Sequence, residues 1–214
     1  MTEQTKTALV LRACAADMTS HNGFRWPESG AVEAPDWDPE PVCGGGLHGL
    51  LWGEGDGSLL SWEPDAKWLV AEIRDGSWVD LDGKVKFPRC EVVFCGDRKG
   101  ATDYIAARAP GRSIVGGTAT AGYYGTATAG YGGTATAGDG GTATAGYGGT
   151  ATAGDGGTAT AGEGGILSVR WWDGRRYRIG TFYVGEDGIE PNTRYRCENG
   201  KAIKVESAKK PEAA

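Results

Sequence analysis

The middle of the sequence lacks every large apolar residue. Between Gly117 and Gly164 there is no Leu, Ile, Val, Phe, Trp or Met. A conventional hydrophobic core cannot form there, because buried Leu, Ile, Val and Phe side chains supply most of the hydrophobic free energy of folding. We therefore expect packed cores only in the flanks, and the first flank is long enough to fold alone.

A long apolar run and a regular cysteine pattern are also missing. Ala8 to Leu11 form a short apolar stretch that Arg12 interrupts, which is too short for a secretory signal or a membrane span. The five cysteines are an odd number, which does not suit a disulfide framework. These features predict a protein of the reducing cytoplasm of a host cell, with no membrane partner.

An excess of basic residues is absent as well. The chain has 22 Lys and Arg against 28 Asp and Glu, a net charge of −6. Binding to a phosphate backbone needs a basic face, so we expect no nucleic-acid partner. No Walker loop, hydrolase elbow or HExxH motif occurs, so the sequence predicts no cofactor and favours a protein without enzymatic activity.

In place of these features the chain carries a tandem repeat. Six octads follow one another without insertion over 117–164, each a GTATAGxG unit except that the first ends in Tyr124 in place of the last glycine. A short fixed period determines the architecture. TATA alternates a β-branched residue with alanine, as in a strand with two unlike faces. The glycines allow a sharp turn after each strand. Two units make a sixteen-residue coil with a strand on each side, so six units predict a β-solenoid of about three coils.

In this solenoid the alanines fill a thin interior and the threonines form the outer surface. The predicted surface residues are Thr118, Thr120, Thr126, Thr128, Thr134, Thr136, Thr142, Thr144, Thr150, Thr152, Thr158 and Thr160. The seventh position of each unit lies in a turn and reads Tyr123, Tyr131, Asp139, Tyr147, Asp155 and Glu163. Units two apart stack, which places Tyr131 on Tyr147 and Asp139 on Asp155. We interpret the two aspartates as solvated turn carboxylates.

The repeat resembles the octapeptide arrays of bacterial ice-nucleation proteins, which carry paired threonines in similar units. The resemblance covers about 48 residues here, whereas the family's arrays are many times longer. It implies weak ice binding or inhibition of ice growth by the threonine ranks, not ice nucleation. The simpler interpretation is a compact β-spacer whose threonines suit exposed strands.

Both ends of so short a solenoid need covers, because open coils expose strand edges and an alanine interior. The sequence predicts an α+β N-terminal domain, the β-solenoid and a β-hairpin cap, a chain that is mainly β overall. The predicted boundaries are 7–112 for the α+β domain, 113–165 for the solenoid, 166–206 for the cap and 207–214 for a disordered tail.

Within the flanks, 97–111 is typical of a helix that ends at Pro110-Gly111. The pairs Asp173-Gly174 and Asn199-Gly200 predict two hairpins. The acidic stretch from His21 to Pro41 predicts little regular structure.

Three residues are candidates for catalysis. His48 lies in a glycine-rich turn that a ligand could approach, although a structural histidine is the simpler interpretation. An ADP-ribosyltransferase-like domain would use a basic residue, a residue on a glycine-led strand and a later glutamate, for which Arg12, His48 and Glu72 or Glu91 are available.

A zinc site is the other chemical alternative for this region. Cys43, His48, Cys90 and Cys95 could form a Cys₃His site. Cys90 and Cys95 are five residues apart, so on a regular strand they should point to opposite faces. We therefore predict free thiols and no metal.

The order of these blocks resembles a group of phage and prophage proteins with no known activity. The matching pieces are Cys43 to His48, the octads, and a C-terminal pattern of Ile189, Pro191, Thr193, Tyr195, Gly200 and Lys201. The resemblance implies a phage-encoded, non-enzymatic binding or scaffolding protein that uses the solenoid as a spacer or interaction surface. Its expected partner is a host or phage protein, with homo-oligomerisation as the alternative.

Overall fold

A computed structural model describes residues 7–20, 23–74 and 76–206. The predicted disordered tail, 207–214, lies outside the described residues. The chain divides into two compact units. The first comprises Met1–Thr118 and Ala129–Tyr131, and the second comprises Ala119–Thr128 and Gly132–Ala214. The C-terminal hairpins therefore share one unit with most of the solenoid.

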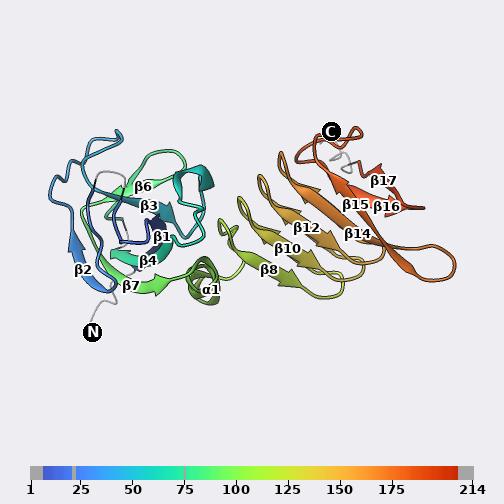
Figure 1. The fold of residues 1–214 in the computed structure, drawn as a ribbon, viewed down its shortest axis with the longest axis horizontal. Coiled ribbons are helices and arrows are strands. Elements are labelled where there is room, and N and C mark those ends of the chain that lie inside the picture. Colours follow the sequence, from blue (N-terminus) through green and yellow to red (C-terminus); the bar gives the residue numbers. More distant parts are fainter. Residues whose placement is uncertain (1–6, 21–22, 75, 207–214) are drawn as a thin grey trace, which may run out of the picture. The chain divides into compact units, whose positions relative to one another are not determined.

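The first unit is built on one antiparallel sheet with the strand order β2-β7-β4-β1-β3-β6-β5 (Figure 1). Its strands are β1 (Thr7–Cys14), β2 (Gly30–Glu33), β3 (Leu47–Leu51), β4 (Lys67–Arg74), β5 (Val79–Asp80), β6 (Val85–Phe87) and β7 (Arg89–Gly96). Strand β2 corrects the expectation of little regular structure between His21 and Pro41. It forms because Val32 pairs with Cys90 and is buried at the sheet edge.

Both faces of the central strands are buried. Leu9 and Leu11 of β1 pack with Ile105 of helix α1 (Arg98–Arg108), which covers one face. Ala8 and Val10 point to the other face, into a cluster that joins residues of β2 and β7 with residues of β3 and β6. Because strands from both sides of the sheet contribute to one cluster, the sheet curls around it.

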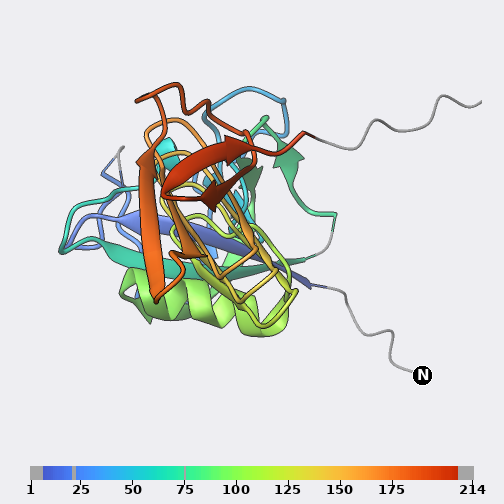
Figure 2. The same cartoon turned by 90° about the vertical axis from the view of Figure 1, so that its right-hand side faces the viewer.

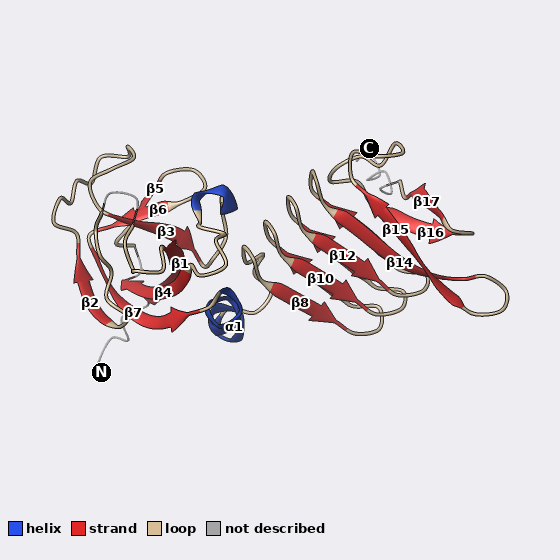
Figure 3. Ribbon diagram, in the orientation of Figure 1, coloured by secondary structure: helices blue, strands red, loops and turns tan. Residues whose placement is uncertain are grey.

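The helix confirms the sequence prediction. Asp97 is its N-cap and accepts a hydrogen bond from the Gly100 N–H at 2.7 Å. The helix ends at Arg108, before Pro110, which lacks the N–H needed to continue it. Figure 3 shows how small the helical content is: beside α1 the described residues form one 3₁₀ turn, η1 (Gly57–Leu59).

The octads form the predicted solenoid, one strand per unit. The strands are β8 (Thr118–Ala121), β9 (Thr126–Ala129), β10 (Thr134–Ala137), β11 (Thr142–Ala145), β12 (Thr150–Ala153) and β13 (Thr158–Ala161). Alternate strands stack in two sheets, so Thr134 lies beside Thr150 and Thr142 beside Thr158 in parallel register. From β9 to β13 the alanines are buried and the threonines lie outside. This arrangement confirms the sixteen-residue coil.

The C-terminal segment extends the solenoid before closing it. Strand β14 (Ile166–Trp172) pairs in parallel with β12, so Leu167 lies beside Ala151 and Val169 beside Ala153. Both residues are buried, which means that the thin alanine interior thickens at its last layer. We name the sheet β15-β14-β12-β10-β8 the first solenoid sheet and the sheet β17-β16-β13-β11-β9 the second solenoid sheet.

Two antiparallel hairpins end the stack. Strand β15 (Tyr177–Tyr183) pairs with β14, and β16 (Tyr195–Glu198) pairs with β13 and with β17 (Lys201–Lys204). The end view in Figure 2 shows β16 and β17, in red, in front of the coils. The Asn199-Gly200 turn has two residues, both with positive φ, as predicted. The other turn runs over 173–176, longer than the two residues that Asp173-Gly174 predicts, because Trp172 pairs with Tyr177.

Candidate functional site

The outer surface of the first solenoid sheet is a regular array of hydroxyl groups. Thr134 lies opposite Thr150, and Thr136 lies opposite Thr152. Neighbouring strands are about 4.8 Å apart, and residues i and i+2 of one strand are about 6.6 Å apart. Threonine is stiff at χ1 because of its β-branch, so the side chains repeat with the backbone. The predicted repeat surface thus forms two parallel ranks on this sheet.

One of these ranks continues beyond the octads. In the cap Ser168 lies opposite Thr152, and Thr181 lies opposite Ser168. We call this row the long hydroxyl rank, and it comprises Thr120, Thr136, Thr152, Ser168 and Thr181. Sequence reasoning missed its last two members because it ended the surface with the repeat. The available signal was that Ser168 follows Thr152 by one sixteen-residue coil.

The second solenoid sheet has shorter ranks. The hydroxyl oxygens of Thr142 and Thr158 are 3.3 Å apart, so these two side chains hydrogen-bond to each other. After β13 the sheet continues with β16, whose Tyr195 is opposite Ala159 and buried. The outward residues beside Tyr195 are the exposed Arg194 and Arg196. Hydroxyls therefore do not extend into the cap on this side.

The seventh positions of the octads lie in the turns between the strands. Along one edge the Tyr124 N–H donates to the Asp139 carbonyl at 3.0 Å, and the Gly140 N–H donates to the Asp155 carbonyl at 2.8 Å. On the other edge the Gly132 N–H donates to the Tyr147 carbonyl and the Gly148 N–H to the Glu163 carbonyl, each at 2.8 to 2.9 Å. These ladders place turns two units apart directly on one another.

The stacked aspartates have partners that the sequence did not reveal. The Asp155 N–H donates to Asp139 Oδ1 at 2.9 Å, and Arg170 Nη1 lies 3.6 Å from the same oxygen. The Arg170 guanidinium also covers the Tyr177 ring at 3.7 Å. Asp139 is therefore held by a backbone donor and a cation, more than the solvated carboxylate that we expected.

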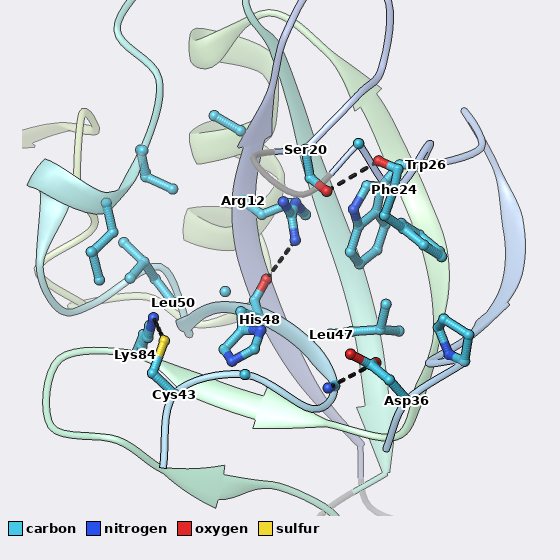
Figure 4. A pocket seen from close by; sticks show the side chains of 18 residues that line it. Arg12, Ser20, Phe24, Trp26, Asp36, Cys43, Leu47, His48, Leu50 and Lys84 are labelled. Carbon is cyan, nitrogen blue, oxygen red and sulfur yellow. Dashed lines mark hydrogen bonds between the residues drawn. The ribbon is translucent and has the colours of Figure 1, made fainter. Parts of the chain in front are cut away.

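Among the candidate catalytic residues, only Arg12 and His48 come together. Arg12 Nη1 donates to the His48 carbonyl oxygen at 2.9 Å (Figure 4). Arg12 is opposite the buried Leu69 of one core cluster, whereas Glu72 is opposite Leu9 of the other. Residues that pair across strands share a face of the sheet, so Glu72 points away from Arg12 and His48. Glu91 is opposite Glu72 and shares its face. The structure does not assemble the carboxylate and basic residues of the enzymatic hypothesis.

Burial and neighbouring cations alter the titration of two residues near Arg12. Burial, with the charges of Lys84 and Arg12, lowers the pKa of His48, which keeps its imidazole neutral near pH 7. Lys84 Nζ lies 3.0 Å from Cys43 Sγ, and this hydrogen bond lowers the pKa of the exposed Cys43 thiol. Cys43 is thus the thiol best placed to ionise.

The candidate zinc ligands are separated. The described residues contain no group of three or more His, Cys, Asp or Glu side chains arranged to hold a metal ion. All five cysteines are free. The expectation that Cys90 and Cys95 point to opposite faces is wrong, because both pack against the same core cluster. The cause is a β-bulge: Val92 pairs with Ala71 and Phe94 with Val70, so Val93 is extra and resets the alternation.

Comparison with known proteins links part of the chain to ice nucleation proteins. It is 46% identical over 104 residues to the ice nucleation protein of Xanthomonas campestris pv. translucens, covering 48% of this chain and 7% of that protein. It is 48% identical over 103 residues to one from Pseudomonas syringae, covering 47% and 9%. It is 42% identical over 99 residues to ice nucleation protein InaU of Pantoea ananas, covering 45% and 10%. The predicted likeness of the repeat to this class is confirmed.

The extent of these matches defines what they show. Each aligned stretch is about twice as long as the 48-residue octad block, so the similarity includes flanking residues. The chain spans about a tenth or less of the length of these relatives. No family model matches the chain, and no solved structure matches it.

The comparisons alter two expectations, the cellular location and the phage origin of the protein. The predicted cytoplasmic location is wrong, because it conflicts with the similarity to ice nucleation proteins, which are surface proteins anchored to the bacterial outer membrane. The relatives give no support to a phage origin or to the N-terminal motif used for that resemblance. Within residues 7–20, 23–74 and 76–206, no helix has the length and apolar character needed to span a bilayer.

Proposed function

We propose that the protein binds ice through the first solenoid sheet. The observation that carries this proposal is the long hydroxyl rank, which runs in register across five strands. At about 4.8 Å per strand the rank is roughly 19 Å long. Water molecules in ice form a periodic array of donors and acceptors, and a rigid periodic row of hydroxyls can hold surface water in a similar order.

The structure of the sheet supports this role in two ways. The strands carry alanines on the inner side that are almost fully buried, from Ala135 to Ala153, so the backbone beneath the hydroxyls is fixed by close packing. The outward side chains are threonines with few rotamers, and ordering water on them costs little side-chain entropy. Similarity to ice nucleation proteins supports the same assignment.

The size of the array favours binding over nucleation. Six octads give three coils, and the chain corresponds to about a tenth or less of the length of its relatives. An ordered water layer over so small an area stabilises only a small ice embryo. We therefore propose adsorption to existing ice and inhibition of its growth as the activity.

A face-by-face comparison tests the proposal. The full chain is assayed for inhibition of ice recrystallisation and for incorporation into a growing ice hemisphere. The double variant Thr136→Lys/Thr152→Lys interrupts the long hydroxyl rank, and Thr144→Lys/Thr160→Lys places the same charges on the second solenoid sheet. Glu163→Lys, in an exposed turn, controls for added charge.

We expect Thr136→Lys/Thr152→Lys to lose most or all of the inhibition of ice recrystallisation and of the incorporation into ice. The variants Thr144→Lys/Thr160→Lys and Glu163→Lys should retain both. Circular dichroism verifies that each variant keeps its strands. The proposal fails if the wild-type chain neither enters ice nor slows recrystallisation. It also fails if interruption of the long hydroxyl rank has no effect.

Scaffolding of a protein partner is the second candidate function. The cap exposes several large side chains on or beside β15, among them Trp172, Tyr177, Ile179 and Tyr183, and exposed aromatic residues are enriched at protein interfaces. The two functions separate experimentally, because Ile179→Lys should weaken capture of a partner while leaving ice binding intact. The comparisons favour ice binding.

A further inference from the structure

The first unit contains a cavity that ice binding does not use. Its volume is about 690 Å³, within the usual range for small-molecule sites. It lies beside β1 and β3 and is bounded by the segments around Phe24 and Cys43 (Figure 4). The apolar part of its wall comes from Phe24, Trp26, Leu50 and Leu60. Such a wall suits the apolar body of a small ligand.

Arg12 supplies a buried positive charge at this wall. Its guanidinium lies over the Trp26 ring at 4.3 Å, and Nη1 donates to the His48 carbonyl at 2.9 Å. Its Nε is buried and has no hydrogen-bond partner among the residues that the structure describes. No ion pair joins Arg12 to a carboxylate in the described ranges. Burial lowers the pKa of Arg12, which is the sign of a charge removed from water without full compensation.

His48 and Lys84 line the cavity together with Arg12. The His48 imidazole is neutral, as described above, so it adds no charge that would oppose Arg12 or Lys84. Lys84 adds a positive charge next to Cys43. Asp36 is the acidic residue of the wall, and its Oδ1 already accepts the Gly46 N–H at 3.2 Å. The polar part of the wall is therefore rich in donors.

These features select one ligand class. The charge of Arg12 is largely removed from water and is paired with no carboxylate within the described ranges, which is costly to the folded protein. A negatively charged oxygen compensates this charge, and hydrogen bonds between ionised groups are about twice as strong as neutral ones. A cation is disfavoured by Arg12 and Lys84, and a neutral apolar molecule leaves both charges uncompensated.

We propose that this cavity binds a small organic anion, with a carboxylate or phosphate oxygen at the Arg12 guanidinium on the side of Lys84 and the apolar part against Trp26 and Phe24. The site is separate from the threonine surface, so it gives the protein a second binding activity. Binding of such an anion also stabilises the first unit by mass action.

Benzoate and phenyl phosphate are suitable probes, with benzyl alcohol as their neutral counterpart. Thermal unfolding and isothermal titration of the full chain measure binding. Alkylation of Cys43 by iodoacetamide, followed by mass spectrometry, locates it, because Cys43 lines the cavity and is exposed. We expect one or both anions to raise the melting temperature and to slow alkylation of Cys43. Comparison of the two anions tells a carboxylate site from a phosphate site.

Three variants connect binding to the proposed groups. Arg12→Gln should weaken binding of the better anion about 10- to 100-fold, the effect of losing a charged hydrogen bond. Arg89→Gln, an exposed arginine of β7, is the matched control and should bind normally. Since Arg12 also holds the His48 carbonyl, Lys84→Gln serves if Arg12→Gln does not fold, because Lys84 is the other cation of the wall, and we expect about tenfold weaker binding.

Several results would overturn the proposal. They are the absence of binding by both anions, equal binding of benzyl alcohol, or unchanged affinity in Arg12→Gln and Lys84→Gln. Loss of ice binding in the threonine variants leaves this site unaffected, so each proposal can fail on its own.

Discussion

Leu167 provides the most direct test of how the solenoid is closed. It occupies the position of an octad alanine one coil beyond Ala151 and is completely buried. Leu167→Ala restores the octad composition but removes most of a buried side chain. The lost transfer free energy is about 0.8 kcal/mol per methylene-sized group, and the remaining cavity adds to it, so we expect a loss of about 2–5 kcal/mol in the free energy of unfolding.

The measurement is denaturant unfolding of the full chain, with hydrogen exchange over 142–169 to assign the effect to the second unit. In a unit of this size each kcal/mol shifts the melting temperature by roughly 4–8 °C, so a decrease of roughly 8–40 °C is expected. Ile179→Ala is the control on the neighbouring strand β15, because its side chain is 69% exposed. Its effect should stay within about 0.5 kcal/mol.

A loss below about 0.5 kcal/mol for Leu167→Ala, the size typical of surface changes, would refute this reasoning. It would mean that the alanine layers close without the larger residues of β14. An equal loss in both variants would also contradict it, because buried area would then not determine the effect.

Three further predictions concern other parts of the chain. Hydrogen bonds from the backbone of Arg176, from the Arg178 side chain and from the backbone of Arg175 lower the pKa of Asp173 to about 2. Because this pKa lies below that of the unfolded chain, ionised Asp173 stabilises the folded turn at every pH above the unfolded pKa. NMR should therefore show the 173–176 turn intact at pH 4 and loosening only as the pH falls through about 2. Lys84→Gln should raise the pKa of the Cys43 thiol and so slow its alkylation near pH 7.5. Cys95, whose pKa is raised by burial, is the internal reference. An unchanged rate at Cys43 would exclude Lys84 as the cause of its lowered pKa. Gly57→Ala places a Cβ 2.5 Å from Tyr131 Cγ and should lower the free energy of unfolding by about 1–3 kcal/mol. The control Gly122→Ala, whose added Cβ has nothing within 4 Å, should leave the melting temperature within a few degrees of wild type. Equal effects of the two variants would contradict the packing of Tyr131 on Gly57.

The solenoid could be predicted because its information is local. Each TATA segment carries its own period of two, and the fixed spacing of eight decides which segments stack. The helix was equally accessible, since Asp97 and Pro110 mark its ends. The second hairpin followed from Asn199-Gly200 alone.

The remaining features depend on pairing between distant segments. Strand β2 is held at a sheet edge by β7, about sixty residues later, and nothing inside its own sequence marks it. The bulge at Val93 is a property of two strands together, so alternation along one strand could not place Cys95. The cavity around Arg12 brings together residues from Arg12 to Lys84, and the glutamate that seemed to complete a catalytic set lies on the opposite face.

The number of octads is even, and this determines which sheet each end of the solenoid joins. Strands β8 and β14 belong to the same sheet because an even number of units separates the entry of the solenoid from its closure. Adding or deleting two units changes the number of layers and leaves both ends on the sheets they now use. A change of one unit would put the entry and the closure on different sheets and would remove Ser168 and Thr181 from the row they complete. The array can therefore lengthen by duplication in steps of sixteen residues. After each such step the long hydroxyl rank remains continuous from the octads into the cap.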